Sequence, residues 1–271
     1  MEKPKEKPTA AEATESLSAH EYLGRRYGLD VFPDLPLADE PFVREWEIIK
    51  DVLSGEAVTS WLEKTPAGGI PVVYARSRAS FGRAVNALSP GGDSADISPS
   101  VNAFTIKAKH PDLPGHRVII LNRSGYSALS EKELGMEEEE WLEKSMTLRL
   151  HHEICHYFSL RVLGGMRNHL LDEIAADCVG QLAAFGTFKA PLQKLFFGIS
   201  QGGVLSGGRF FFYVKKLRED AVGAVLEETE AALSNLESYL SKNPDMVLEP
   251  NRPRLVTKLL TAGIPGIRAL D

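Results

Sequence analysis

Two histidines and a glutamate lie together in the sequence, where His152-Glu153-Ile154-Cys155-His156 fits the pattern H-E-x-x-H. Four positions make just over one turn of an α-helix, so both imidazoles would project from one face, about 6 Å apart along the axis. Two ring nitrogens placed in this way can each approach one Zn²⁺ at about 2.0–2.1 Å. The pattern therefore predicts a helical metal site with His152 and His156 as ligands.

Glu153 lies about 100° around the same helix, within reach of a metal-bound water but outside the coordination positions. Zinc lowers the pKa of such a water toward about 7, and a carboxylate can pass its proton to a leaving group. We therefore expect Glu153 to be the general base of a hydrolysis. The alternative is two ordinary histidines four positions apart, but burying them with a carboxylate in so apolar a helix is costly unless they bind something.

A catalytic zinc needs three protein ligands and one open position. Glu173 is the expected third ligand, because it follows His156 by 17 positions on a second expected helix, beyond a reversal at Gly164-Gly165. Asp177 lies one turn further, where a carboxylate can accept the other N–H of a ligating histidine. An acidic helix N-terminus would explain Glu173 but not Asp177. His169 is a competing third ligand, although that choice leaves Glu173 without a role.

The pattern His152-Glu153-x-x-His156 followed by Glu173-x-x-x-Asp177 resembles the gluzincin branch of the zincin metallopeptidases. The resemblance covers only the stretch from Leu148 to Leu182. It implies that both histidines and the first acid of the second motif bind zinc, and that Glu153 is the general base. It also implies that Asp177 supports one of the histidines.

The same resemblance implies a fold. We expect an α+β, zincin-like structure, in which a small N-terminal β-sheet with helices packs on a mostly helical C-terminal part that carries the active-site helices. A cleft would separate the two parts. By analogy with the family architecture, the strand from Arg117 to Asn122 would form the edge of the cleft and pair with an extended substrate.

The sequence departs from the gluzincin pattern in three respects. The gap between His156 and Glu173 is shorter than in many members, and Asp172 stands where asparagine is frequent. Gluzincin peptidases usually have a downstream His or Tyr that stabilises the oxyanion, and no histidine follows His169. Tyr213, with Arg209 behind it, is the best substitute in the sequence, although an aromatic helix face packed in the core is the favoured interpretation of both residues.

The elements that must position these residues follow from the rest of the chain. Residues 1–16 are rich in Lys, Glu, Pro, Ala and Thr and predict a flexible tail. Apolar spacing predicts an amphipathic helix from Glu40 to Leu62. The segment from Lys64 to Ser130 contains no glutamate and is rich in glycine, serine, proline and β-branched residues, which predicts strands and turns. The strand candidates are Ile70 to Ala75, Ala103 to Ala108, and Arg117 to Asn122.

After Ser130 the pattern is helical. Ser130 and Glu133 fit a capping box. A long helix is expected from Met136 to Leu163 and a second from about Asn168 to Phe185, with two or three more beyond a glycine-rich link from Gly198 to Gly208. The chain therefore divides into a tail (1–16), an N-terminal α/β part (17–130) and a helical part (131–271), the last two forming one compact unit with a cleft.

Composition excludes several classes of protein. The 271 residues include 31 basic and 37 acidic side chains, a net charge of −6, which argues against a nucleic-acid or anionic-membrane partner. No apolar run approaches the roughly 20 residues that span a bilayer, and the first residues lack the apolar core of a secretory signal. Two cysteines cannot form a disulfide framework. We therefore expect a cytoplasmic protein.

Three hypotheses follow. The first is a zinc-dependent metallohydrolase, a peptidase that acts on peptide or protein substrates through a zinc-activated water with Glu153 as general base. The second is a zincin-like scaffold that binds a partner or senses metal with little or no turnover, which the missing downstream histidine motivates. The third is a helical protein in which the motif is fortuitous. The oligomeric state stays open.

Overall fold

The computed structural model describes residues 17–90, 97, 101–113, 115–166, 169–200, 203–204, 208–215 and 217–271. The expected tail and part of the glycine-rich link, residues 201–202 and 205–207, lie outside these residues. The chain forms two compact units: unit 1 comprises Met1–Gly28, Asn168–Ile174 and Phe188–Asp271, and unit 2 comprises Leu29–Arg167 and Ala175–Thr187. The structure is α+β, as expected. The division of the chain at residue 130 stays a prediction.

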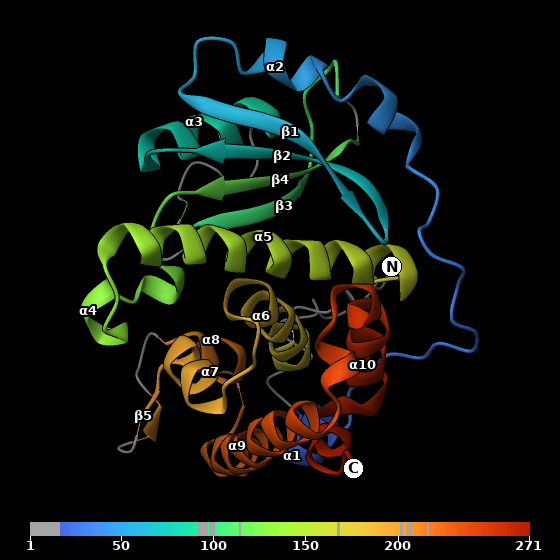
Figure 1. The fold of residues 1–271 in the computed structure, drawn as a ribbon, viewed down its shortest axis with the longest axis vertical. Helices are drawn as coiled ribbons and strands as arrows, with labels where there is room; N and C mark the ends of the chain where they lie inside the picture. Colours follow the sequence, from blue (N-terminus) through green and yellow to red (C-terminus); the bar gives the residue numbers. More distant parts are fainter. Residues whose placement is uncertain are drawn as a thin grey trace, which may run out of the picture. The chain divides into compact units, whose positions relative to one another are not determined.

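Unit 2 contains a four-stranded sheet (Figure 1). Its strands are β1 (Val58–Thr65), β2 (Gly68–Ala75), β3 (Ala103–Lys107) and β4 (Arg117–Asn122), in the order β1-β2-β4-β3. Strands β2 and β4 are parallel, and the other neighbours are antiparallel.

The expectation that the strand from Arg117 to Asn122 forms a free edge is wrong, because β4 is paired on both sides and β3 lies at the edge. The physical reason is burial. Residues 118–122 of β4 are all buried, as is usual for an interior strand, whereas four of the five β3 residues are half-buried.

The two faces of the sheet carry different layers. Val73 and Ile120 belong to a core with the apolar side of α3 (Arg78–Leu88), and Phe104 and Ile106 of β3 pack against that core. Side chains alternate along a strand, so Thr105 faces the other way. That face packs against α5 (Glu138–Val162), which contacts β3 and β4 and runs beside them in Figure 1.

The expected helix from Glu40 to Leu62 is wrong over its second half. A 3₁₀ turn (Pro41–Glu45) and α2 (Ile48–Val52) account for the helical spacing of its first half. The chain then turns through Gly55, whose φ is +89°, and enters β1, which pairs with β2 along its whole length. Long-range pairing therefore overrides the local pattern.

Helix α3 was not predicted, because only strands and turns are expected between Lys64 and Ser130. It begins after Ser77, whose side chain accepts a hydrogen bond from the Ser80 amide. This is the usual chemistry of a helix N-cap.

The expected helices after Ser130 are confirmed. The capping box of Ser130 and Glu133 opens α4 (Glu131–Leu134), which ends at Gly135 in the left-handed conformation. Helices α5 and α6 (Leu170–Phe185) match the expected long and second helices within about two residues.

Unit 1 is mostly helical. Helices α9 (Glu219–Lys242) and α10 (Arg252–Arg268) pack against each other, and α1 (Ala19–Leu23) contacts both. Helix α7 (Ala190–Phe197), which was not expected, precedes a two-stranded ribbon and α8. The remaining elements are β5 (Ile199–Ser200), β6 (Gly203–Val204), α8 (Arg209–Val214) and the 3₁₀ turns Pro244–Val247 and Glu249–Asn251.

Among the described helices, none combines the length and apolar character needed to cross a membrane.

Candidate metal centre

Helix α5 presents the two histidines of the motif on one face. His152 and His156 are buried, and their Nε2 atoms lie 2.9 Å apart with the rings nearly perpendicular, at 87°. Two nitrogens that each lie 2.0–2.1 Å from one tetrahedral ion would be about 3.3 Å apart. The spacing of the Nε2 atoms is therefore close to that of two ligands on a shared ion.

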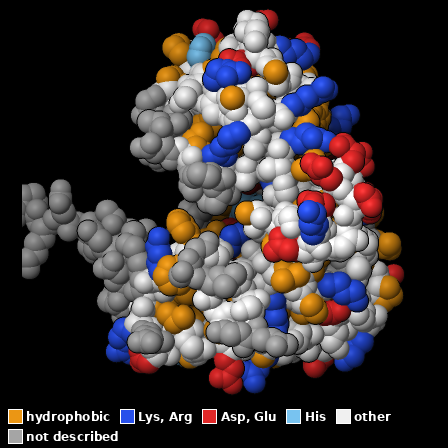
Figure 2. Space-filling model, turned by 90° about the vertical axis from the view of Figure 1, so that its left-hand side faces the viewer, with side chains coloured by type: hydrophobic (Ala, Val, Ile, Leu, Met, Phe, Trp, Pro, Cys, Tyr) orange, Lys and Arg blue, Asp and Glu red, His pale blue; other side chains and the backbone are white. Residues whose placement is uncertain are grey.

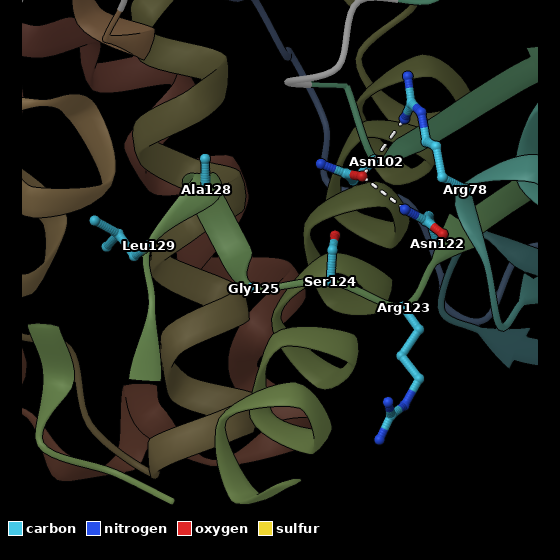
Figure 3. A pocket seen from close by; sticks show the side chains of 8 residues that line it. All are labelled: Arg78, Asn102, Asn122, Arg123, Ser124, Gly125, Ala128 and Leu129. Carbon is cyan, nitrogen blue, oxygen red and sulfur yellow. Dashed lines mark hydrogen bonds between the residues drawn. The ribbon is translucent and has the colours of Figure 1, made fainter. Parts of the chain in front are cut away.

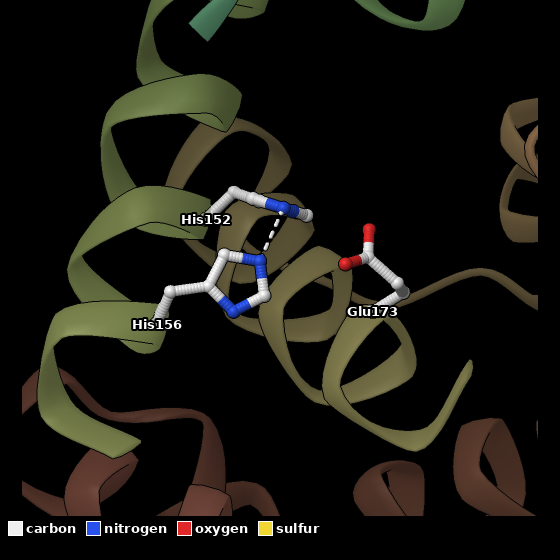
Figure 4. A group of neighbouring side chains, drawn as sticks. All are labelled: His152, His156 and Glu173. Carbon is white, nitrogen blue, oxygen red and sulfur yellow. Dashed lines mark hydrogen bonds between the residues drawn. The ribbon is translucent and has the colours of Figure 1, made fainter. Parts of the chain in front are cut away.

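Glu173 supplies the third ligand atom of the cluster. One ligand atom each from His152, His156 and Glu173 lie within 4.8 Å of one another, and all three residues are buried. Figure 4 shows the carboxylate on the side of the two imidazoles. This buried His-His-Glu cluster could hold a metal ion. The prediction from sequence thus named the three residues that the structure brings together.

Asp177 lies one turn after Glu173 on the continuous helix α6 and contacts the ring nitrogen of His152 that faces away from the cluster. The distance from His152 Nδ1 to Asp177 Oδ1 is 2.7 Å, and Asp177 is fully buried. With Nε2 as the ligand atom, Nδ1 carries the proton and donates it to this carboxylate. The contact fixes both the tautomer and the orientation of the ring.

Tyr126 is a member of this arrangement that sequence reasoning missed. Its hydroxyl donates to Asp177 Oδ1 at 2.5 Å and lies 2.9 Å from His152 Nδ1. Oδ1 of Asp177 therefore contacts both the Tyr126 hydroxyl and Nδ1 of His152. Tyr126 follows β4 with only Arg123-Ser124-Gly125 between them, and nothing in its spacing from the motif signals this contact.

The loop that carries Tyr126 is closely held by α5. The Tyr126 amide donates to Ser145 Oγ at 3.0 Å, and the buried Arg149 donates to the carbonyls of Ser124 and Gly125 at 2.6 Å each. A Cβ at Gly125 would lie 2.2 Å from a backbone oxygen, so only glycine fits there.

The two residues that follow Tyr126 are also unusual. Ser127 and Ala128 have φ angles of +52° and +60°, which non-glycine residues rarely adopt. Such conformations persist only where surrounding contacts over-determine them. The backbone next to Tyr126 is therefore constrained by its contacts.

Glu153 is held outside the cluster. Its Oε2 accepts a hydrogen bond from Thr105 Oγ1 at 2.7 Å, and the residue is 8% exposed. Thr105 is the middle residue of the edge strand β3 and faces α5. Sequence reasoning did not anticipate this contact, because it joins residues 48 positions apart.

Glu173 has a cationic partner. Arg209 Nη2 lies 2.5 Å from Glu173 Oε2, and their side chains are 24% and 6% exposed. Opposite charge compensates the cost of burying the carboxylate. Arg209 is the first residue of α8, in the aromatic segment that also contains Tyr213.

Two other predicted residues have different surroundings. The carbonyl of Tyr213 accepts a hydrogen bond from Tyr22 at 3.4 Å, and the role of its hydroxyl at the site stays a prediction. His169, the competing third ligand, is not a member of the cluster; its Nε2 lies 3.0 Å from the Tyr22 carbonyl oxygen.

Asp172, the second departure from the gluzincin pattern, accepts hydrogen bonds at the N-terminal end of α6. Its Oδ2 accepts from the His169 amide at 3.1 Å, and its Oδ1 accepts from the Tyr27 hydroxyl. These contacts cap the helix and fix where α6 begins. The register of Glu173 and Asp177 follows from that start.

Comparison with known proteins gives one family. The model of a family of unknown function, DUF7005, matches residues 102–263, which is more than half of the chain and includes every residue of the cluster. The chain belongs to this family. No curated protein matches it, and no solved structure matches it.

Proposed function

We propose that this member of the DUF7005 family is a zinc-dependent hydrolase with a zincin-like fold that acts on peptides or proteins. The observation that carries the proposal is the buried cluster of His152, His156 and Glu173. Two imidazole nitrogens and one carboxylate oxygen are a donor set typical of catalytic zinc, with a fourth position left for water or substrate.

The chain's own residues would divide the work as follows. Bound zinc would supply Lewis acidity and lower the pKa of water toward about 7. Glu153, oriented by Thr105, would take the proton of the attacking water and deliver it to the leaving nitrogen. Asp177 and Tyr126 would keep the His152 ring in place during turnover.

A peptide substrate is supported by the edge strand. No described strand pairs with β3 on the side away from β4. An extended peptide can add to such an edge through backbone hydrogen bonds. Thr105, in the middle of β3, contacts Glu153, so a peptide paired there would lie near the proposed general base.

The proposal includes a cytoplasmic location without a nucleic-acid or membrane partner. Cys155 and Cys178 are buried and are not joined in a disulfide, which is the usual state in a reducing compartment. Figure 2 shows basic and acidic side chains interspersed on one face of the molecule. That distribution supports a surface that does not concentrate phosphate groups.

A second candidate is a metal-sensing or partner-binding scaffold with little turnover. The ion pair between Arg209 and Glu173 favours it, because a cation already compensates the buried carboxylate when no metal is bound. The two candidates differ in whether Glu153 has a chemical role.

The test is the variant Glu153→Gln, which keeps the size of the side chain and its contact with Thr105 but cannot accept a proton. We expect zinc binding to be unchanged and hydrolysis of a peptide library to fall by about 10²- to 10⁴-fold. Zinc content is measured by elemental analysis and cleavage by mass spectrometry. A variant as active as the wild type would contradict the mechanism, whereas a zinc-loaded wild type without hydrolysis would favour the scaffold.

A further inference from the structure

The sheet of unit 2 has two edge strands, β3 and β1, whose surroundings differ (Figure 1). The residue before β3, Asn102, lines a cavity of about 390 Å³ and accepts hydrogen bonds from Asn122 and Arg78 (Figure 3). Residues 98–100, just upstream, lie outside the described part of the chain. The strand β1 is instead described throughout, together with the residues that flank it.

Strand β1 presents a long and regular backbone edge. Its residues pair with β2 one to one, from Val58 opposite Ala75 to Thr65 opposite Gly68, so the strand contains no bulge. It also contains no proline. Every second residue of an antiparallel edge strand directs its N–H and C=O groups away from its partner. Natural proteins usually blunt such edges with bulges, prolines or covering elements, because another chain can pair with them.

No described element pairs with the outer side of β1. Within the described part of the chain, the backbone hydrogen bonds of residues 59–64 are all made to β2. The same strand is the only described element in extensive contact with β1. At about 3.4 Å per residue, the eight residues of β1 offer an edge about 27 Å long.

The side chains of β1 are compatible with a second copy of the same strand. Trp61, in the middle, is half-buried, and its Nε1 donates to Glu63 Oε2 at 2.8 Å on the same face. Aromatic side chains are enriched at protein interfaces. The strand has one acidic and one basic residue, Glu63 and Lys64, and therefore no net charge. It can lie against its own copy without net repulsion.

Charge and length restrict the register of such a pair. A two-fold axis normal to the sheet pairs β1 with its copy in antiparallel fashion about one central residue. An axis at Glu63 or at Lys64 would place like charges directly opposite each other, which is destabilising. An axis at Ser60 or before it would pair fewer residues. Trp61 and Leu62 remain as possible centres.

Hydrogen bonding favours Leu62 as the centre. An axis at Trp61 would use Val58, whose N–H already donates to the Glu56 carbonyl at 2.9 Å. An axis at Leu62 pairs residues 59–65 and places the two leucines against each other. This register uses nearly the whole strand.

We propose that the protein forms a symmetric dimer in which β1 pairs antiparallel with β1 of a second copy, about Leu62. Ser60 of one protomer then lies opposite Lys64 of its partner, and Trp61 lies opposite Glu63. The two four-stranded sheets join into one sheet of eight strands with a β3 edge at each end. The proposal does not depend on zinc or on hydrolysis.

The first test is sedimentation equilibrium of the full-length protein from low to high micromolar concentration. We expect a reversible equilibrium between monomer and dimer. Ser60→Lys should weaken dimerisation by about three- to tenfold, because two lysines then lie opposite each other at two symmetric sites. Ser60→Lys combined with Lys64→Glu should restore the wild-type affinity, because each repulsion becomes an attraction. Ser234→Lys, at an exposed position of α9, is the matched control and should dimerise as the wild type does.

The second test is disulfide trapping, which reports on the register even if Ser60→Lys fails to fold. Leu62→Cys places two thiols across the axis with Cβ atoms about 4.5–5.5 Å apart, so mild oxidation should give a covalent dimer. The native Cys155 and Cys178 are buried. Thr59→Cys lies opposite Thr65 in this register and is the control that should give no covalent dimer.

Wild-type protein that remains monomeric at high micromolar concentration would overturn the proposal and leave the edge to a different chain. A dimer that Ser60→Lys does not weaken and that Leu62→Cys does not trap would also overturn it, because the two copies would then meet at another surface.

Discussion

Two carboxylates one turn apart on α6 have opposite surroundings. Glu173 is paired with a cation, Arg209, from the short helix α8 of the same unit. Asp177 lies within hydrogen-bond distance of the Tyr126 hydroxyl and of His152 Nδ1, inside the other unit. As whole residues, Glu173 is 5% exposed and Asp177 is fully buried.

The difference fits two roles, metal binding and the positioning of a histidine ring. A carboxylate ligand supplies negative charge and must exchange one positive partner for another. Arg209 is partly exposed and can therefore give way to an ion. A supporting carboxylate must instead hold a ring in one orientation, and the Tyr126 hydroxyl helps to position that carboxylate without competing for the metal. These surroundings support the proposal that Glu173 binds the metal and that Asp177 positions His152.

The largest expected effect follows from removing the ligand itself. Glu173→Ala should weaken zinc binding about a hundredfold or more, because it removes one of only three protein ligands. Affinity is measured by competition with a chromophoric chelator. Glu143→Ala, which removes an exposed carboxylate of α5, is the control and should bind zinc as the wild type does. Unchanged affinity in Glu173→Ala would place the third ligand elsewhere.

A smaller effect is expected on the supporting side. Tyr126→Phe removes one donor to Asp177 and should weaken zinc binding by about tenfold, at the lower end of the 10–100-fold typical of outer-shell partners. The same chelator competition applies.

Tyr157→Phe is the matched control, since Tyr157 adjoins His156 in the chain but its hydroxyl donates to Glu40 and Gly69. Both variants lose a buried hydrogen bond, worth about 1 kcal/mol of unfolding free energy. Only Tyr126→Phe should change zinc affinity. Equal zinc affinities in the two variants would contradict a role for the Tyr126 hydroxyl in supporting the metal ligand His152.

The smallest effect has the opposite sign. Arg209→Gln should strengthen zinc binding by about two- to fivefold, because it removes a repelling charge and leaves Glu173 without its cation, in the range of partly exposed ion pairs. The gain should shrink at high salt. Arg218→Gln, at an exposed arginine that pairs with Asp220, should change nothing. Weaker zinc binding in Arg209→Gln would mean that the arginine positions Glu173 for the metal.

Local spacing was sufficient to predict much of the site from sequence. Helices α5 and α6 are long, and the four-residue spacings within each helix fix which side chains share a face. The partners Tyr126, Thr105 and Arg209 were not predicted, because they lie 26, 48 and 36 positions from the residues that they contact. Such contacts are set by tertiary packing.

The fold shows the same limit. The helical spacing from Glu40 is real only as far as α2, and β1 forms because β2 is available to pair with it. The order of the sheet could have been inferred more closely. The run Val118-Ile119-Ile120-Leu121 is apolar on both faces, which is typical of an interior strand rather than an edge.

The most direct test of the account is anomalous diffraction at the zinc edge from crystals of protein purified without chelators. We expect one peak per chain, about 2.0–2.2 Å from Nε2 of His152, Nε2 of His156 and a carboxylate oxygen of Glu173. A zinc peak elsewhere would contradict the claim that these three residues form a metal centre. The absence of a peak, with Glu173 still in its ion pair with Arg209, would contradict it as well.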